Sequence, residues 1–242
     1  MGRWHLPVAE RRRALAWAAG GLGAVAVGAL VAWSPLLAVR SIEVAGASHV
    51  SRDQVIDAAG IGSGTRTFLV DEAAIEDRLE DAPWVARATV ETRLPSTVVI
   101  RIRERRPLAA IQELGGYALL AADGALLDHV DRPWSLPVIV SAPMQSGVAW
   151  ATTAARALAE IEPRVRKMIE RVIVEPGPEI VLGMHSGVVV EFGSPDDAEA
   201  KGEALGAVLR WADRNGVHVG VVDVRAPGSP AIHSESGKRL ST

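Results

Sequence analysis

The sequence predicts an α+β fold with three parts: an N-terminal transmembrane helix, a β-α-α-β-β domain, and a mixed β domain with two helices. Three observations support this organisation. Residues 14–39 carry no charged side chain. Residues 41–103 show two helix-start signals followed by a period-two pattern. After Pro107, short apolar runs alternate with turns rich in Gly and Pro, and two stripes have helical spacing. Helices and strands mixed in this way are typical of α+β domains.

The uncharged segment of residues 14–39 is long enough to cross a membrane. Its 26 residues would span about 39 Å as an α-helix, against roughly 30 Å for a hydrocarbon core. Pro35 could end or kink this helix, but residues 14–34 alone would suffice. Arginines at positions 11, 12 and 13 precede it, so the positive-inside rule places residues 1–13 in the cytoplasm and the remainder outside. A cleaved signal peptide is the alternative, but its apolar region is normally shorter.

Small residues recur every four positions along this segment. They are Ala16, Gly20, Ala24, Gly28 and Ala32. Such a ridge lets another transmembrane helix approach closely. The alternative is that Ala and Gly are simply common in this chain. The sequence therefore offers Gly20, Ala24, Gly28 and Ala32 as a transmembrane packing face.

Residues 40–106 read as strand, helix, helix, strand, strand. Residues 41–44 form the first candidate strand. Ser51 with Gln54 forms a capping box that starts a helix ending at Gly60, and Asp71 starts the second helix. The acidic residues of the second helix are expected to form a solvated face: Glu72, Glu76, Asp77, Glu80 and Asp81.

Apolar and polar residues then alternate along residues 86–93 and 98–103, on either side of a turn at residues 94–96. This period of two predicts an antiparallel hairpin with one buried face. We expect a three-stranded sheet with both helices on one side.

Residues 107–233 predict a second, β-rich domain. Strands are expected at residues 108–112, 117–121, 125–128, 136–140, 169–174, 180–184, 188–192 and 217–224. One helix follows the apolar stripe from Trp150 to Ile161 and ends before Pro163. A second is expected to be capped by Ser194, with Pro195 at its first position, and to close at Gly216. Residues 234–242 are expected to be a flexible tail.

Composition and motifs argue against several functions. The chain has no cysteine, so disulfides and thiolate chemistry are excluded. The net charge is −3, and because the first 13 residues are basic, the rest is mildly acidic, which argues against nucleic acid as a partner. The six histidines form no metal-binding or catalytic motif. Asp128, His129 and Asp131 read as a polar loop. No catalytic, cofactor-binding or metal-ligating residue is therefore predicted.

Several motifs together resemble the FtsQ/DivIB family of bacterial cell-division proteins. VRSIEVAG at residues 39–46 follows the apolar segment, and RLPSTVVIRIRERRPLA covers residues 93–109. GVVVEFGS at residues 187–194, Lys201 and VVDVRAPGSPAI at residues 221–232 complete the pattern. The resemblance covers residues 14–233. It implies that residues 40–106 are a POTRA domain and residues 107–233 are the family's β domain.

The resemblance also implies a function and a binding segment. A family member would be a non-catalytic scaffold of the divisome, held in the plasma membrane at the septum, that links early and late division proteins. It would bind FtsB/DivIC, itself paired with FtsL, and so control septal peptidoglycan synthesis. The implied contact residues are Asp223, Val224, Arg225, Ala226, Pro227, Gly228, Ser229, Pro230, Ala231 and Ile232.

Within that segment, Arg225 would pair either with an acidic partner side chain or with an acid of its own domain. Asp223 would either contact the partner or order the turn after its strand. Two other functions are alternatives. A membrane-anchored cell-envelope enzyme would show a polar cluster in a concave pocket, whereas a scaffold would show an exposed strand edge at residues 221–232. An outer-membrane assembly component is disfavoured because the chain has too few residues for a large β-barrel.

Overall fold

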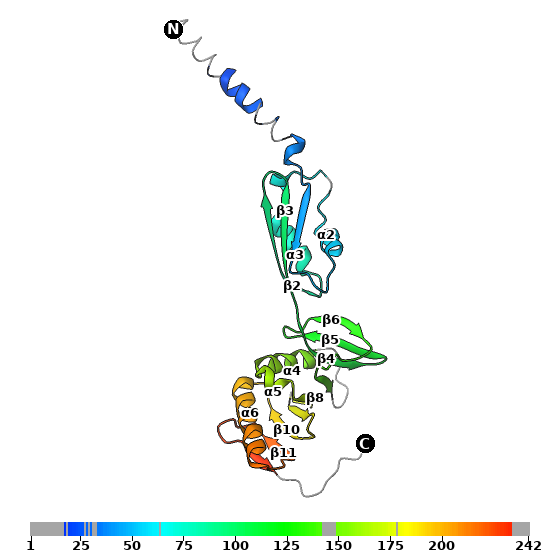
Figure 1. The fold of residues 1–242 in the computed structure, drawn as a ribbon, viewed down its shortest axis with the longest axis vertical. Helices are drawn as coiled ribbons and strands as arrows, with labels where there is room; N and C mark the ends of the chain where they lie inside the picture. Colours follow the sequence, from blue (N-terminus) through cyan, green and yellow to red (C-terminus); the bar gives the residue numbers. More distant parts are fainter. Residues whose placement is uncertain are drawn as a thin grey trace, which may run out of the picture. The chain divides into compact units, whose positions relative to one another are not determined.

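The computed structural model describes residues 17, 19–26, 28, 30, 33–62, 64–141, 149–177 and 179–233. The chain divides into two compact units, residues 1–104 and residues 105–242 (Figure 1). Each unit has its own hydrophobic core.

The apolar N-terminal segment is only partly described. Its described residues from Trp17 to Leu30 have helical backbone. No helix within the described part of the chain combines the length and the apolar character that a membrane span requires. Gly20, Ala24 and Gly28 lie on the described helical backbone and are exposed, whereas Ala16, Ala32 and the basic tail of residues 1–13 fall outside the description.

The predicted helix does not continue to Val39, which corrects the boundary drawn from apolar character alone. Ser34 accepts a hydrogen bond from the amide of Leu36 at 3.1 Å and starts the 3₁₀ helix η1 (Pro35–Leu37). Ala38 then forms an isolated β-bridge with Arg66. Proline has no amide hydrogen and cannot continue the hydrogen-bond ladder of a preceding helix.

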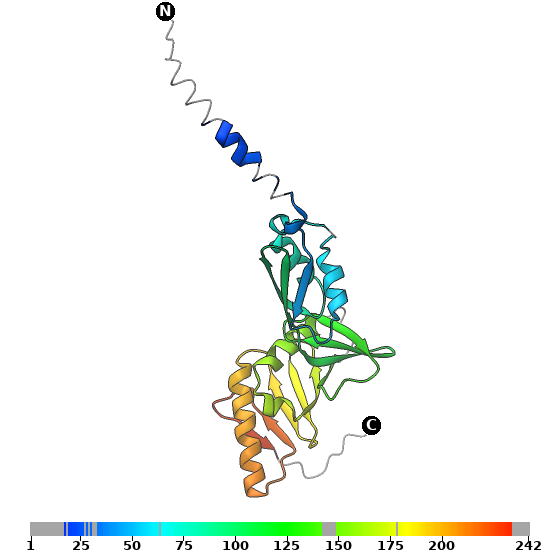
Figure 2. The same ribbon diagram turned by 45° about the horizontal axis from the view of Figure 1, so that its top comes forward.

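The first unit contains a three-stranded sheet with the order β1-β3-β2. Its strands are β1 (Ser41–Ala45), β2 (Val85–Arg93) and β3 (Thr97–Glu104). The central strand β3 runs parallel to β1 and antiparallel to β2. Helices α2 (Arg52–Ala59) and α3 (Glu72–Glu80), with the 3₁₀ helix η2 (Thr67–Leu69) between them, cover one face (Figures 1 and 2). The predicted β-α-α-β-β order is confirmed.

Both helix starts are formed as predicted. The Ser51 hydroxyl accepts from the Gln54 amide at 3.2 Å, and the Gln54 side chain accepts from the Ser51 amide at 2.9 Å. Asp71 accepts from the Ala74 amide at 3.1 Å. Gly60 ends α2 with φ of 62°, a backbone conformation that favours glycine.

The second unit contains a nine-stranded mixed sheet with the order β12-β11-β10-β9-β8-β7-β4-β5-β6. The strands are β4 (Pro107–Glu113), β5 (Gly116–Ala121), β6 (Leu126–Val130), β7 (Val138–Ser141), β8 (Ile169–Val174), β9 (Ile180–Met184), β10 (Val189–Gly193), β11 (Val221–Asp223) and β12 (Ala231–His233). The neighbouring pairs β4–β7, β7–β8 and β10–β11 are parallel, and the others are antiparallel.

Three helices accompany this sheet: α4 (Ala149–Glu160), α5 (Pro163–Arg166) and α6 (Ala198–Asn215). The apolar faces of α4 and α6 join the strand side chains in one core, in which Leu158, Phe192 and Leu205 are at most 1% exposed. The helix predicted before Pro163 is confirmed. Pro163 itself starts the additional short helix α5, where its fixed φ suits the first helical position.

Three expectations for this unit are wrong in detail. Ser194 does not cap the last helix: α6 begins at Ala198, and its preceding residue Asp197, with φ of 54°, makes no side-chain capping bond. The Ser194 carbonyl oxygen instead accepts a hydrogen bond from the buried Lys201 ammonium at 2.8 Å. Strand β6 continues past the predicted end at Asp128, so His129 belongs to the strand rather than to a loop after it, and it pairs with Glu113 at 3.0 Å.

The third correction concerns the end of the sheet. The final predicted strand, residues 217–224, is reduced to the three residues of β11. A turn then brings the chain back as β12, which the sequence did not reveal because Pro227, Gly228 and Pro230 precede it.

Candidate functional site

The predicted contact segment of residues 223–232 lies at one end of the nine-stranded sheet. It consists of the end of β11, an exposed turn, and the start of β12. β11 is held on both sides, since it pairs in parallel with β10 and antiparallel with β12. Within the sheet formed by the described residues, β12 and β6 are the two edge strands, and β12 is the edge at this end. The exposed edge expected along residues 221–232 is therefore confined to β12.

The directions of the backbone groups identify what this edge presents. The Val224 amide donates to the Glu191 carbonyl of β10 at 3.0 Å. Because backbone groups point to alternate sides along a strand, those of Val222 also face β10 and those of Val221 and Asp223 face β12. In the antiparallel pairing Val222 lies opposite Ile232. The amide and carbonyl of Ile232 therefore point away from β11, toward the open edge.

The side chains of this segment divide into a buried and an exposed group. Val222 and Val224 are 0% exposed and belong to the core. Ile232 is half-buried and packs against the same core. The exposed members of the segment are Arg225, Ala226, Gly228, Ser229, Pro230 and Ala231.

A compact ion-pair network holds the start of the turn. Asp223 accepts hydrogen bonds from the Arg225 amide at 2.9 Å and from its guanidinium at 2.6 Å. The same guanidinium lies 2.8 Å from Glu191 of β10. Hydrogen bonding to Arg225 lowers the pKa of Asp223, and pairing with Asp223 raises the pKa of Arg225. Of the roles considered for these residues, the structure shows an intradomain ion pair for Arg225 and turn ordering for Asp223.

Gly193 at the end of β10 makes room for this network. It has φ of 76°, and a Cβ atom there would lie 2.8 Å from Cγ of Arg225. Beyond Arg225 the chain turns back, with the Ser229 amide donating to the Ala226 carbonyl at 3.0 Å. The turn is thus fixed at its base while its tip is exposed. Sequence reasoning missed Glu191 and Gly193, because only the parallel pairing of β10 with β11 brings them beside Arg225.

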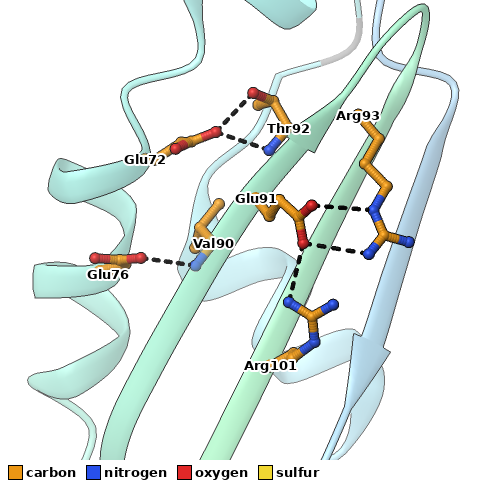
Figure 3. A network of polar contacts seen from close by, with 7 residues as sticks. All are labelled: Glu72, Glu76, Val90, Glu91, Thr92, Arg93 and Arg101. Carbon is orange, nitrogen blue, oxygen red and sulfur yellow. Dashed lines mark hydrogen bonds and ion pairs between the residues drawn. The ribbon is translucent and has the colours of Figure 1, made fainter.

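In the first unit, the outward-facing amides of one sheet edge are hydrogen-bonded by a neighbouring helix. Helix α3 lies beside the free edge of β2, and three of its carboxylates accept hydrogen bonds from β2 amides. Figure 3 shows two of these contacts, those of Glu72 and Glu76. Glu72 accepts from Thr92 at 2.7 Å, Glu76 from Val90 at 2.7 Å, and Glu80 from Ala88 at 3.0 Å.

The expectation that the acidic residues of α3 form a solvated face is therefore wrong for these three glutamates. They recur every four residues on the helix, and the amides they meet recur every two residues on the strand. Their spacings match because four helical residues rise about 6 Å and two strand residues about 6.8 Å. The four-residue spacing of these glutamates is visible in the sequence. The same spacing is equally typical of an acidic stripe that faces solvent.

A further carboxylate stabilises the loop before α2. Glu104 at the end of β3 accepts from the amides of Ser48, His49 and Val50 at 2.7 to 3.0 Å, and from the His49 ring at 3.1 Å. Burial by itself would raise the pKa of Glu104, but these hydrogen bonds outweigh burial and lower the pKa to about 2. His49 also stacks on Trp84, with ring centroids 4.3 Å apart.

No group of three or more potential metal-ligating side chains occurs within the described ranges of the chain. The arrangement at β11 and β12 offers backbone hydrogen-bond groups and a fixed turn. Such an edge can accept an extended segment as an additional strand.

Comparison with known proteins gives two adjoining family matches. Residues 37–105 match the model described as POTRA domain, FtsQ-type. Residues 109–225 match the model described as Cell division protein FtsQ/DivIB, C-terminal. The second match ends at Arg225, so it includes β11 and stops before β12.

Curated relatives agree with these matches. The cell division protein FtsQ of Corynebacterium glutamicum is 31% identical over 201 residues, covering 77% of this chain and 85% of the relative. FtsQ of Mycobacteroides abscessus is 29% identical and covers 86% of this chain, but the chain spans just under two thirds of that relative, 66%. DivIB of Geobacillus kaustophilus is 29% identical, covering 86% of this chain and 82% of the relative. By the two family matches and these relatives, the chain belongs to the FtsQ/DivIB family of bacterial cell division proteins.

Proposed function

We propose that this protein is a non-catalytic scaffold of the divisome. It binds an FtsB/DivIC-like protein, itself paired with an FtsL-like protein, and so links early and late division proteins and controls septal peptidoglycan synthesis. Membership of the FtsQ/DivIB family supports a role in cell division. The scaffold mechanism is argued from the sheet edge.

The observation that carries the proposal is the position of β12. Its neighbour β11 has both sides occupied, so at this end of the sheet an incoming strand would join at β12. The outward-facing backbone of Ile232 would supply a hydrogen-bond donor and an acceptor, and the exposed turn of residues 226–230 would flank the incoming segment. Backbone pairing of this kind supplies affinity, and side-chain contacts supply specificity.

Topology is the second part of the proposal. The uncharged segment of residues 14–39 anchors the protein in the plasma membrane as a single pass, with residues 1–13 cytoplasmic and both folded units outside. The exposed small residues Gly20, Ala24 and Gly28 support a further contact with a partner's transmembrane helix, and Ala32 would extend that face by one turn.

The test of the edge compares Ile232→Pro with Ile232→Ala in the full-length protein. Both variants lose the isoleucine side chain, but only proline also removes the outward-facing amide hydrogen. We expect Ile232→Pro to lose co-purification with the FtsB/DivIC-like protein of the same bacterium. Ile232→Ala should retain most of it, with both variants folded by circular dichroism. Equal binding by the two variants would refute docking at β12.

Localisation tests the division role separately. A functional fluorescent fusion should gather at mid-cell in dividing cells, and uniform envelope fluorescence would contradict a septal role. Replacing residues 14–39 with an unrelated transmembrane helix would then show whether the small-residue face adds to recruitment.

A further inference from the structure

The first unit presents a sheet face that its own helices leave uncovered. Among the described residues of this unit, α2 and α3 pack on the face formed by Val98, Ile100 and Ile102 of β3. The side chains that alternate with these point away from the helices. On β2 and β3 they are Arg87, Thr89, Glu91, Arg93, Val99, Arg101 and Arg103.

In one half of this outer face the arginines are paired with a carboxylate. Glu91 accepts hydrogen bonds from Arg93 at 3.2 and 3.3 Å and from Arg101 at 3.0 Å (Figure 3). The hydrogen bonds from Arg93 and then from Arg101 lower the pKa of Glu91. At this end of the face Arg93 and Arg101 share one carboxylate partner, Glu91.

In the other half the arginines are paired more weakly. Arg87 of β2 lies directly opposite Arg103 of β3 in the antiparallel register. Both are exposed, and within the described chain Arg103 forms no ion pair. Arg87 forms a long ion pair with Glu80 at 3.9 Å, and the same Glu80 oxygen accepts a hydrogen bond from the Ala88 amide at 3.0 Å. Like charges directly opposite each other destabilise a sheet, so this arrangement is not explained by the stability of the unit.

Arg87 and Arg103, together with the Glu91-paired Arg101, border an open depression. It has a volume of about 480 Å³ and is lined by Arg87, Thr89, Arg101, Ile102 and Arg103. The register places two rungs along it, Arg87 opposite Arg103 and Thr89 opposite Arg101. Successive rungs on one face of a sheet are about 6.8 Å apart, which is also the spacing of alternate side chains in an extended peptide.

We propose that this arginine face, defined by Arg87, Thr89, Arg101 and Arg103, binds an acidic segment of a partner protein. Carboxylates at alternate positions of an extended segment would meet the two rungs, and the planar guanidinium fork binds carboxylates through paired hydrogen bonds. The depression is elongated over two rungs and is larger than one small anion requires. This site uses none of the residues at β12, so it is a second contact surface, independent of the proposed docking there.

The test uses the purified full-length protein and two labelled peptides, Glu-Ser-Glu-Ser-Glu-Ser and its glutamine counterpart, measured by fluorescence anisotropy at low salt. We expect saturable binding of the acidic peptide alone, weakening as salt is added. The double variant Arg87→Ser/Arg103→Ser should bind about tenfold more weakly. The matched control Arg93→Ser removes an arginine of the same face that already has a partner, and should change binding less than about twofold.

Three results would overturn the proposal. The first is no binding of the acidic peptide, and the second is equal binding by the double variant. The third is displacement of the peptide by inorganic phosphate, or by phosphatidylglycerol vesicles, at equal or lower anion concentration, which would assign the face to a small anion or to lipid. The double variant should still co-purify with the FtsB/DivIC-like protein, because that contact is proposed at β12. This result distinguishes a loss of binding at the arginine face from a loss of docking at β12.

Discussion

The free edge of β2 in the first unit and the edge strand β12 in the second are both borders of sheets, but they differ in what occupies their backbone. At β2, carboxylates from α3 take up three successive outward-facing amides. At β12, the backbone of Ile232 faces outward beside an exposed turn. Unpaired edges invite other strands, and proteins commonly block those that must stay free. The contrast indicates that β2 is closed by its own helix and β12 is left available.

The largest expected effect comes from a charge placed in the core next to the β12 edge. Val224→Asp would place a charge in a site that is 0% exposed, and we expect the second unit to lose more than about 4 kcal/mol of unfolding free energy. Ala231→Asp, at an exposed position of the same edge, should cost less than about 0.5 kcal/mol. Urea unfolding followed by circular dichroism measures both. Similar destabilisation by the two variants would mean that the buried and exposed sides of this segment are assigned wrongly.

Acid should loosen the first unit through Glu104. Its folded pKa of about 2 lies below the ordinary glutamate value of 4.5, so the unfolded state binds the proton more tightly. The stabilisation is present above about pH 4.5 and is lost as pH falls toward 2, on the order of 3 kcal/mol. Urea unfolding of the first unit at a series of pH values measures this loss. Glu104→Gln should flatten the dependence, and an unchanged slope in that variant would assign it to other groups.

Removing one carboxylate from the β2 edge should have a moderate effect on the stability of the first unit. Glu76→Ala leaves the Val90 amide without its acceptor, and we expect a loss of about 1–3 kcal/mol in the first unit. Asp77→Ala, at the exposed neighbouring position, is the matched control and should be near neutral. Thermal unfolding compares them. If the two variants are equally stable, the carboxylates of α3 do not stabilise β2.

The smallest effect concerns the arginine face. Arg103→Thr removes the like charge opposite Arg87 and should stabilise the first unit by about 0.2–1 kcal/mol. Arg101→Thr removes an arginine that is paired with Glu91 and should give no such gain. Urea midpoints distinguish the two. Destabilisation by Arg103→Thr would show that Arg103 has a structural role.

Local signals in the sequence predicted the elements well. The capping box at Ser51, the stop at Gly60 and the alternation along residues 98–103 each depend on neighbours only a few residues apart, and the structure confirms them. The pattern therefore established the β-α-α-β-β order of the first unit and most strands of the second.

Features that depend on distant pairing were not predictable in the same way. β12 has only three residues, and nothing local distinguishes it from a tail after Pro230. Ser194 and Pro195 resemble a helix start. In the structure the Ser194 carbonyl accepts a hydrogen bond from the Lys201 ammonium, and α6 begins only at Ala198. Glu76 accepts a hydrogen bond from the Val90 amide only because α3 lies beside β2 in the folded unit. In each case the deciding partner lies on another element.

Hydrogen–deuterium exchange, measured with and without the FtsB/DivIC-like partner, tests the contrast between the two edges most directly. In the free protein the Val90 amide, which donates to Glu76, should exchange slowly, whereas the outward-facing Ile232 amide should exchange quickly. Adding the partner should slow exchange at β12 and leave β2 unchanged. Protection that appears at β2, or that fails to appear at β12, would contradict the assignment of β12 as the docking edge.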